Sequence, residues 1–316
     1  MLTTIVLLII GLIVLIVGGD YLVRGSSSIA LRLHLSPLVV GLTIVAFGTS
    51  APELLISIQS ALKGSPDLVM GNVVGSNICN LALVLGLTAV INPVKVQINS
   101  IRFDWPMTMG ASILLYLIVR EGSIAAFEGI LFLIIIISYL IFIIQQSRKE
   151  TKANISAGDK DEIPEMPSKQ IWKDLVFIAI GCVGLYFGSE WFVNSAKELA
   201  LSIGVEERVV GLTVVALGTS LPELVTAAVA SYKGQTDLAL GNLMGSNIFN
   251  ILSILGITSI IREIHVHIDI LNKDIIWMLM ITLMILPFMI MRREIGRVDG
   301  FILLLVYVVY IYTVIV

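Results

Sequence analysis

The sequence predicts an all-α polytopic membrane protein. Ten transmembrane helices are expected, arranged as two inverted five-helix repeats whose broken helices meet at the membrane midplane. Three observations support this fold class: an apolar composition, ten apolar stretches of membrane-spanning length, and two phrases that each occur twice. The 316-residue chain has a mean hydropathy of +0.98, with 57% hydrophobic and 14% charged residues. Soluble domains are closer to half apolar and a quarter charged, so this composition indicates a membrane protein.

The predicted helices come from a scan for stretches of about 20 apolar residues, the length that crosses a bilayer. Ten stretches qualify: 3–24, 37–62, 68–90, 103–120, 125–145, 171–194, 208–232, 238–261, 274–291 and 298–315. The segment 146–170 is charged, contains proline and has no periodicity, which predicts a flexible linker. The chain is therefore expected to comprise a first repeat (1–145), a cytoplasmic linker (146–170) and a second repeat (171–316).

Several functional classes are not favoured by the composition. The net charge of −3 gives no indication of a nucleic-acid partner. Cys79 and Cys182 lie in apolar runs, and the three histidines fall in short loops, so no disulfide framework, resident metal or other cofactor is expected. An intramembrane enzyme is not indicated, because the chain contains neither H-E-x-x-H nor G-x-S-x-G. No obligatory protein partner is evident, and the expected surroundings are the lipid bilayer.

The two halves are copies of each other. A shift of 170 positions places "GLTIVAFGTSAPE" (41–53) on "GLTVVALGTSLPE" (211–223), and "GNVVGSNICN" (71–80) on "GNLMGSNIFN" (241–250). With an odd number of helices in each copy, the second copy begins on the opposite side of the membrane from the first. The copies are therefore expected to be inverted about an axis in the membrane plane.

The distribution of Lys and Arg predicts the orientation. Basic residues gather in and just after the linker, and again at Arg292, Arg293 and Arg297. These regions lie on one side of a ten-helix model, and an excess of Lys and Arg marks the cytoplasmic side. The protein is expected in the cell membrane, with both termini outside.

The phrase "GTSAPE" places an acid within an apolar stretch. Pro52 has no N–H and Gly48 weakens the helix, so the helix is expected to break near 46–50 and leave carbonyl groups free. Thr49, Ser50 and Glu53 add hydroxyl and carboxylate oxygens, and the copy supplies Thr219, Ser220 and Glu223. Oxygen ligands suit hard cations such as Ca²⁺ or Na⁺. The phrase also fits a capping box, which is compatible with a cation site because a broken helix needs a cap.

The phrase "GSNICN" adds a second set of polar residues. Ser76 and Asn80 are four positions apart and share a helix face, as do Ser246 and Asn250 in the copy. Asn77 and Asn247 are expected to point elsewhere, away from the face that carries these Ser and Asn pairs. The alternative is helix packing through small residues, because Gly71 and Gly75, and likewise Gly241 and Gly245, are four positions apart. Ser and Asn would then form hydrogen bonds between helices.

Inversion should bring these phrases together. Glu53 and Glu223 would face each other near the midplane, flanked by the helices that carry the Ser and Asn pairs. Two bare carboxylates would repel each other, and one Ca²⁺ or several Na⁺ would neutralise them. Asp20 and Glu190, which follow "GG" and "GS" in the first helix of each half, are interpreted as interfacial anchors.

Paired G-T-S-x-P-E and G-S-N-x-x-N motifs in inverted five-helix halves resemble the cation/calcium antiporter superfamily. More narrowly, they resemble its sodium/calcium exchanger branch, in the compact form found in prokaryotes. The resemblance covers the chain apart from the linker. It implies that Glu53 and Glu223 bind Ca²⁺ and share Na⁺, surrounded by oxygens of the following residues: Thr49, Ser50, Thr219, Ser220, the carbonyls of Ala46 and Ala216, Ser76, Asn80, Ser246 and Asn250.

The resemblance also implies a mechanism. The first helix of each half would slide across the other eight as a gate, and several Na⁺ would move against one Ca²⁺. Potassium-dependent relatives carry Asp where this chain has Asn250, which argues against potassium dependence. The alternative is a proton-coupled antiporter of Ca²⁺ or another divalent cation, although Thr49 replaces the Asn of that branch. A cation channel is less favoured, because two inverted copies with acids at the midplane favour alternating access.

Overall fold

The computed structural model describes residues 2–64, 66–157, 170–204 and 218–315. The first half contains α1 (Leu2–Leu33), α2 (Pro37–Val40), α3 (Ala46–Thr49), α4 (Ala51–Leu62), α5 (Pro66–Ile78), α6 (Leu85–Ile91), α7 (Trp105–Val119) and α8 (Ala126–Ala157). Three π-helical segments join some of these helices: η1 (Gly41–Val45), η2 (Cys79–Val84) and η3 (Ser100–Asp104). Two short strands, β1 (Val94–Lys95) and β2 (Ser123–Ile124), complete this half.

The second half repeats this order. Its described helices are α9 (Ile171–Ser202), α12 (Leu221–Tyr232), α13 (Thr236–Phe249), α14 (Leu255–Ile261), α15 (Ile275–Arg292) and α16 (Arg297–Ile315). The π-helical segments η5 (Asn250–Ile254) and η6 (Ile270–Asp274) and the strands β3 (Ile264–His265) and β4 (Glu294–Ile295) occupy the equivalent places. The first part of the predicted span 208–232 lies outside the described residues.

The strands pair between the halves. β1 pairs antiparallel with β4, with Val94 opposite Ile295, and β2 pairs antiparallel with β3, with Ile124 opposite Ile264. The first strand of each half therefore pairs with the second strand of the other half. This reciprocal pairing is the arrangement that a two-fold relation between the halves produces.

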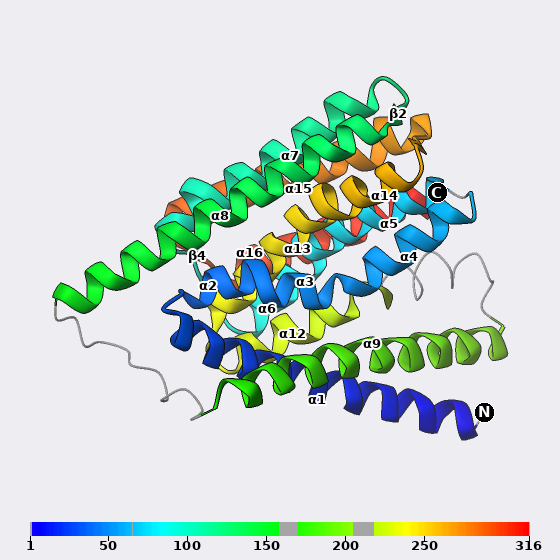
Figure 1. The fold of residues 1–316 in the computed structure, drawn as a ribbon. Coiled ribbons are helices and arrows are strands. Elements are labelled where there is room, and N and C mark those ends of the chain that lie inside the picture. The colour runs from blue at the N-terminus through cyan, green and yellow to red at the C-terminus, as the bar shows by residue number, and fades with distance from the viewer. Residues whose placement is uncertain (1, 65, 158–169, 205–217, 316) are drawn as a thin grey trace.

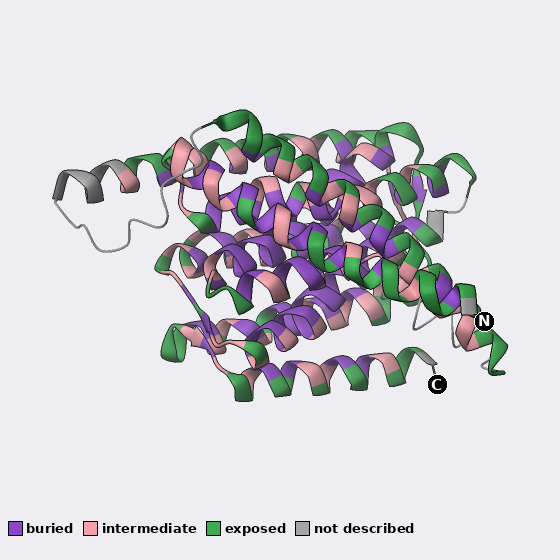
Figure 2. Cartoon of the chain, turned by 90° about the horizontal axis from the view of Figure 1, so that it is seen from below, coloured by how far each residue is buried: buried purple, intermediate pink, exposed green. Residues whose placement is uncertain are grey.

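The helices form a central layer between two outer groups (Figure 1). Helices α1 and α9 lie side by side along one edge, and α7, α8 and α15 lie along the opposite edge. The central spans 68–91 and 236–261 are 72% and 78% buried in their most apolar windows, against 17% for α9. Buried residues accordingly concentrate in the middle of the molecule, whereas the outer helices expose long apolar faces, as lipid-facing helices do (Figure 2).

Seven described helices are long and apolar enough to cross a membrane, and the bent pair Pro37–Thr49 and Ala51–Leu62 makes an eighth. Two predicted spans are missing from this count. The span 103–120 corresponds to α7, a helix of only 15 residues that follows the charged segment η3. The span 208–232 is described only in part. The chain is thus a multi-pass helical membrane protein, and the count of ten is not confirmed.

Several helices are longer than predicted. Helices α1 and α9 each have 32 residues and continue beyond the apolar stretches that end at 24 and 194. Helix α8 continues to Ala157, so the first part of the predicted linker is helical. That part contains no Gly or Pro, and Gln146 donates a hydrogen bond to Glu150 one turn later at 2.7 Å. At about 1.5 Å per residue, these helices exceed the bilayer core of about 30 Å and extend past it.

Candidate functional site

The predicted helix break is present in the first half. Helix α3 ends at Thr49 and α4 begins at Ala51, with a bend of 45° between the two parts. Pro52 occupies the first turn of α4, where its missing N–H costs nothing. Helix α12 begins in the same way, with Pro222 in its first turn. Each acid therefore lies in the first turn of a helix, Glu53 in α4 and Glu223 in α12.

Both carboxylates are buried, with 1% exposure for Glu53 and 0% for Glu223. The Oε1 atom of Glu223 accepts hydrogen bonds from Ser50 at 2.8 Å and Ser246 at 3.4 Å. The other Glu223 oxygen and both Glu53 oxygens have no hydrogen-bond partner among the described residues. A buried charge without a partner is very unfavourable, so this arrangement requires a cation or a proton.

Hydroxyl groups surround the acids. Thr49 is buried, and its Oγ1 donates to the carbonyl of Ala46 at 3.3 Å and lies 3.4 Å from the Ser246 hydroxyl. The Ser220 hydroxyl is buried without a partner among the described residues. Thr219 is half-buried and lines a cavity described below. Ala216 lies outside the described residues.

The asparagines form a reciprocal network between α5–η2 and α13–η5. Asn80 donates to Oδ1 of Asn247 at 3.3 Å, and Asn250 donates to Oδ1 of Asn77 at 3.1 Å. The interpretation that Asn77 and Asn247 point elsewhere was wrong, because they hold the amides of Asn80 and Asn250 across the interface.

This network leaves two oxygens available. The Oδ1 atoms of Asn80 and Asn250 are buried without partners among the described residues. Asn80 lies within η2 and Asn250 begins η5, and π-helical turns often occur at functional sites. Ser76 is also buried on α5, but within the described part of the chain no hydrogen bond joins it to Glu53 in the way that Ser246 is bonded to Glu223.

The sequence reasoning missed Asn72 and Asn242. The Oδ1 atom of Asn242 accepts from Thr49 at 3.1 Å, and Asn72 donates to Ser57 at 3.1 Å and to the Glu53 carbonyl at 3.4 Å. Both asparagines are therefore in contact with the broken helix of the first half. The signal was present, since each follows the first glycine of a repeated phrase, at 71 and 241.

A cavity of about 300 Å³ lies between α4 and α9, and its lining includes Pro52, the residue before Glu53. Its lining also includes polar side chains that can contact a hydrated cation: Gln59, Ser189, Glu190, Asn194 and Thr219. The site is thus composed of two acids, hydroxyls and amides, and the described part of the chain has no cluster of three or more His, Cys, Asp or Glu side chains. Such a set of oxygen ligands is suited to binding hard cations.

A family sequence model described as "Sodium/calcium exchanger protein" matches residues 3–145 and 173–316. The chain belongs to the sodium/calcium exchanger family. This exchanger is 31% identical to the sodium/calcium exchanger MaX1 of Methanosarcina acetivorans, with 96% of each chain covered. It is also 31% identical to the inner membrane protein YrbG of Escherichia coli (strain K12), over 90% of this chain and 87% of that protein.

Solved structures agree with the family assignment. A structure of the sodium-calcium exchanger NCX_Mj superposes with a TM-score of 0.84 at 31% identity, covering 98% of both chains. The family and the fold are those of transporters rather than enzymes. The exchanger is therefore a membrane antiporter of the cation/Ca²⁺ class within the cation/calcium antiporter superfamily.

Proposed function

We propose that this exchanger moves Na⁺ in one direction and Ca²⁺ in the other by alternating access. The observation that carries the proposal is the pair of buried carboxylates, Glu53 and Glu223, presented by broken helices among hydroxyl and amide oxygens. One Ca²⁺ neutralises both acids, and so do several Na⁺, so one site accepts either cargo but not both at once.

The proposed ligand set follows the sequence motifs. Glu53 and Glu223 bind Ca²⁺ and share Na⁺, with oxygens from the equivalent residues of each half around them: Thr49, Ser50, Ser76, Asn80, Thr219, Ser220, Ser246, Asn250 and the carbonyls of Ala46 and Ala216. The free Oδ1 atoms of Asn80 and Asn250 support this assignment for the amides. Sodium coupling is favoured over proton coupling, because amide and hydroxyl oxygens bind cations over a wide pH range without titrating.

The proposed architecture is two inverted five-helix repeats, 1–145 and 171–316, joined by a cytoplasmic linker. The proposed ten spans are the eight counted under the overall fold, together with α7 and the span 208–232. Two features support a two-fold relation between the halves: reciprocal strand pairing and the reciprocal Asn80–Asn247 and Asn250–Asn77 hydrogen bonds. With five helices in each proposed repeat, this relation would be an inversion.

The experiment that tests the function is ⁴⁵Ca²⁺ uptake into proteoliposomes. Uptake is expected to be saturable and driven by an outward Na⁺ gradient, with an equal proton gradient ineffective. Uptake driven by the proton gradient alone would establish the proton-coupled alternative. Ca²⁺ flow without any counter-ion gradient dependence would establish a channel.

The expected topology has the 146–170 segment in the cytoplasm and both termini outside. A cysteine at Lys149, which is exposed on α8, should resist impermeant thiol reagents in intact cells. A cysteine at Glu121, in the exposed turn after α7, should react readily. Both variants lack Cys79 and Cys182. The opposite labelling pattern would reverse the orientation.

A third carboxylate in the site should alter ion coupling. Asn250 is buried and its Oδ1 has no partner among the described residues, so Asn250→Asp adds a third acid to the proposed ligand set. A bare third charge must bind a proton or another cation. Wild-type uptake is expected to need no K⁺, whereas Asn250→Asp should become sensitive to pH, to K⁺, or to both, in ⁴⁵Ca²⁺ uptake at several pH values. A strictly K⁺-dependent wild type, or a variant equal to wild type throughout, would remove Asn250 from the proposed site.

A further inference from the structure

Helices α1 and α9 form one unit. They approach so closely at Gly18 and Gly181 that an added Cβ would lie 2.8 Å from the backbone nitrogen of Leu185 and 2.7 Å from that of Leu22. Polar contacts join the helices at both ends. Arg32 forms an ion pair with buried Asp174 at 3.1 Å near one end.

At the other end, Thr4 donates a hydrogen bond to Glu198 at 3.1 Å. With backbones in contact along the seam and polar contacts at both ends, a displacement of α1 carries α9 with it.

The α1–α9 unit makes different contacts with the two helices that carry the acids, α12 and α4. On the side of α12, an added Cβ at Gly19 of α1 would lie 3.2 Å from the Val225 side chain. Asp20, the next residue, forms an ion pair with Lys233 at the end of α12, and about a quarter of each side chain is exposed (28% and 27%). Ser27 adds a hydrogen bond of 2.7 Å to Gln235. These contacts hold α1 against α12.

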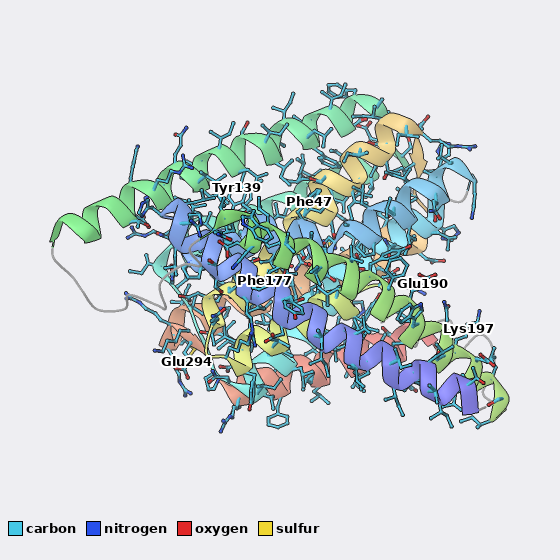
Figure 3. All side chains as sticks on the ribbon, turned by 60° about the horizontal axis from the view of Figure 1, so that its bottom comes forward. Phe47, Tyr139, Phe177, Glu190, Lys197 and Glu294 are labelled. Carbon is cyan, nitrogen blue, oxygen red and sulfur yellow. The ribbon has the colours of Figure 1, made fainter. Side chains whose placement is uncertain are left out.

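On the side of α4, the ion pair equivalent to Asp20–Lys233 is not formed. Shifting by 170 positions carries Asp20 to Glu190 and Lys233 to Lys63, so both the acid and the base are retained. Glu190 is exposed and lines the cavity between α9 and α4, on the face of α9 seen in Figure 3. Lys63 is also exposed, and it makes no ion pair within the part of the chain that the structure describes.

The position of Lys63 suits a partner on α9. It is the C-cap residue of α4, as Lys233 is of α12. Lys63 is one helical turn beyond Gln59, which lines the same cavity as Glu190, so Lys63 lies on the face of α4 that borders this cavity. Arg262 donates to the Ala61 carbonyl beside it at 3.4 Å, which gives this end of α4 a second positive charge. Both cations attract Glu190 toward α4.

We propose that Asp20–Lys233 and Glu190–Lys63 are alternative ion pairs that hold the α1–α9 unit in one or the other of two positions. The proposal rests on the alternating access proposed above. In the described position, Asp20–Lys233 closes the α12 side and the α4 side is open. Because the unit moves as one body, closing Glu190 onto Lys63 separates Asp20 from Lys233. The four residues are positioning residues for transport and do not bind the cargo at the central site.

Pairs of introduced cysteines test whether the two ion pairs exclude each other. The background is the full-length protein lacking Cys79 and Cys182, and its Na⁺-driven Ca²⁺ uptake is measured first. A short bis-thiosulfonate reagent should link Asp20→Cys to Lys233→Cys in one ion condition and Glu190→Cys to Lys63→Cys in another. Each link should stop uptake, and reduction should restore it. The mismatched pair Asp20→Cys with Lys63→Cys is the control and should not link.

The outcomes separate the alternative-pair proposal from the transport proposal. If Glu190→Cys and Lys63→Cys never link in a protein that still exchanges, the alternative pairs are refuted. Both links within a single four-cysteine molecule would also refute them. If the links alternate but no Na⁺-driven Ca²⁺ uptake occurs with the unlinked protein, the alternative pairs stand and the Na⁺/Ca²⁺ assignment fails.

Removing single charges gives a second test. If these residues had a purely structural role, the measured labelling rate would not change. The readout is the labelling rate of Asn194→Cys, which lines the α4–α9 cavity, by an impermeant thiol reagent. Lys233→Gln should lower this rate and Lys63→Gln should raise it, each by about two- to five-fold, the range expected for a partly exposed ion pair. The control Glu121→Gln should leave it unchanged. Shifts of both lysine variants in the same direction would overturn the proposal.

Discussion

Glu53→Gln and Glu223→Gln are each expected to abolish Na⁺-driven Ca²⁺ uptake while the protein remains folded. Each substitution removes one of the two buried carboxylates and keeps the size of the side chain. In a site of low dielectric, the attraction between Ca²⁺ and one carboxylate amounts to several kcal/mol. We therefore expect Ca²⁺ affinity to fall by at least about 100-fold, since each 1.4 kcal/mol is a factor of ten. ⁴⁵Ca²⁺ uptake and Ca²⁺ binding to the purified protein measure the two effects.

Thermal unfolding distinguishes loss of the ligand from loss of the fold. In cation-free buffer the Gln variants should have a Tm equal to or above that of wild type, because a buried unpaired carboxylate destabilises the protein. The rise should be larger for Glu53→Gln, since Glu53 has no hydrogen-bond partner on either oxygen and Glu223 has two on one oxygen.

Ca²⁺ should raise the Tm of wild type and of the control Glu121→Gln, but not that of either site variant. A well-folded Glu53→Gln or Glu223→Gln protein with wild-type uptake would show that these acids do not bind the cargo.

The sequence predicted the parts of the structure that depend on local chemistry. The break between α3 and α4 follows from Gly48 and Pro52, and the structure has it at Ser50. The burial of Glu53 and Glu223 follows from acids inside apolar stretches. The family assignment followed from the doubled motifs and is confirmed by the matched family. The roles of individual ligands stay predictions.

Features that depend on tertiary contacts could not be read from local patterns. Hydropathy marks where a chain leaves the bilayer, and it does not mark where the helix ends, so α8 was predicted too short. Asn77 and Asn247 each accept a hydrogen bond from the amide of an asparagine in the opposite half, and the pattern of a single helix does not predict such a contact. The uneven position of α1 and α9 cannot be predicted from two repeats that share the same motifs. Equivalent motifs predict equivalent contacts, whereas alternating access requires unequal ones.

Gly245→Ala is expected to disrupt both the fold and the site. Helix α13 packs against η1, and a methyl group at Gly245 would lie 2.6 Å from the Cα of Leu42 and 2.9 Å from the Cβ of Ala46. Ordinary contacts between such atoms are near 3.5–4.0 Å, and backbone atoms cannot rotate away as a side chain can. Alanine favours a helix by up to about 1 kcal/mol over glycine. Overpacking costs about 1–3 kcal/mol, so the clash outweighs the gain in helix propensity.

The displacement reaches the cation site directly. Ser246 follows Gly245 and contacts both Thr49 and Glu223, and Asn242 on the same helix accepts from Thr49. Moving α13 away from η1 lengthens these contacts, so Ca²⁺ uptake should fall by at least about ten-fold, which is 1.4 kcal/mol. The matched control is Gly110→Ala on α7, where an added Cβ has nothing within 4 Å, and its Tm and uptake should equal or exceed wild type. If Gly245→Ala matched the control in both measurements, close contact between α13 and η1 would not be what positions Ser246, and the proposed arrangement of hydroxyls around Glu223 would have to be abandoned.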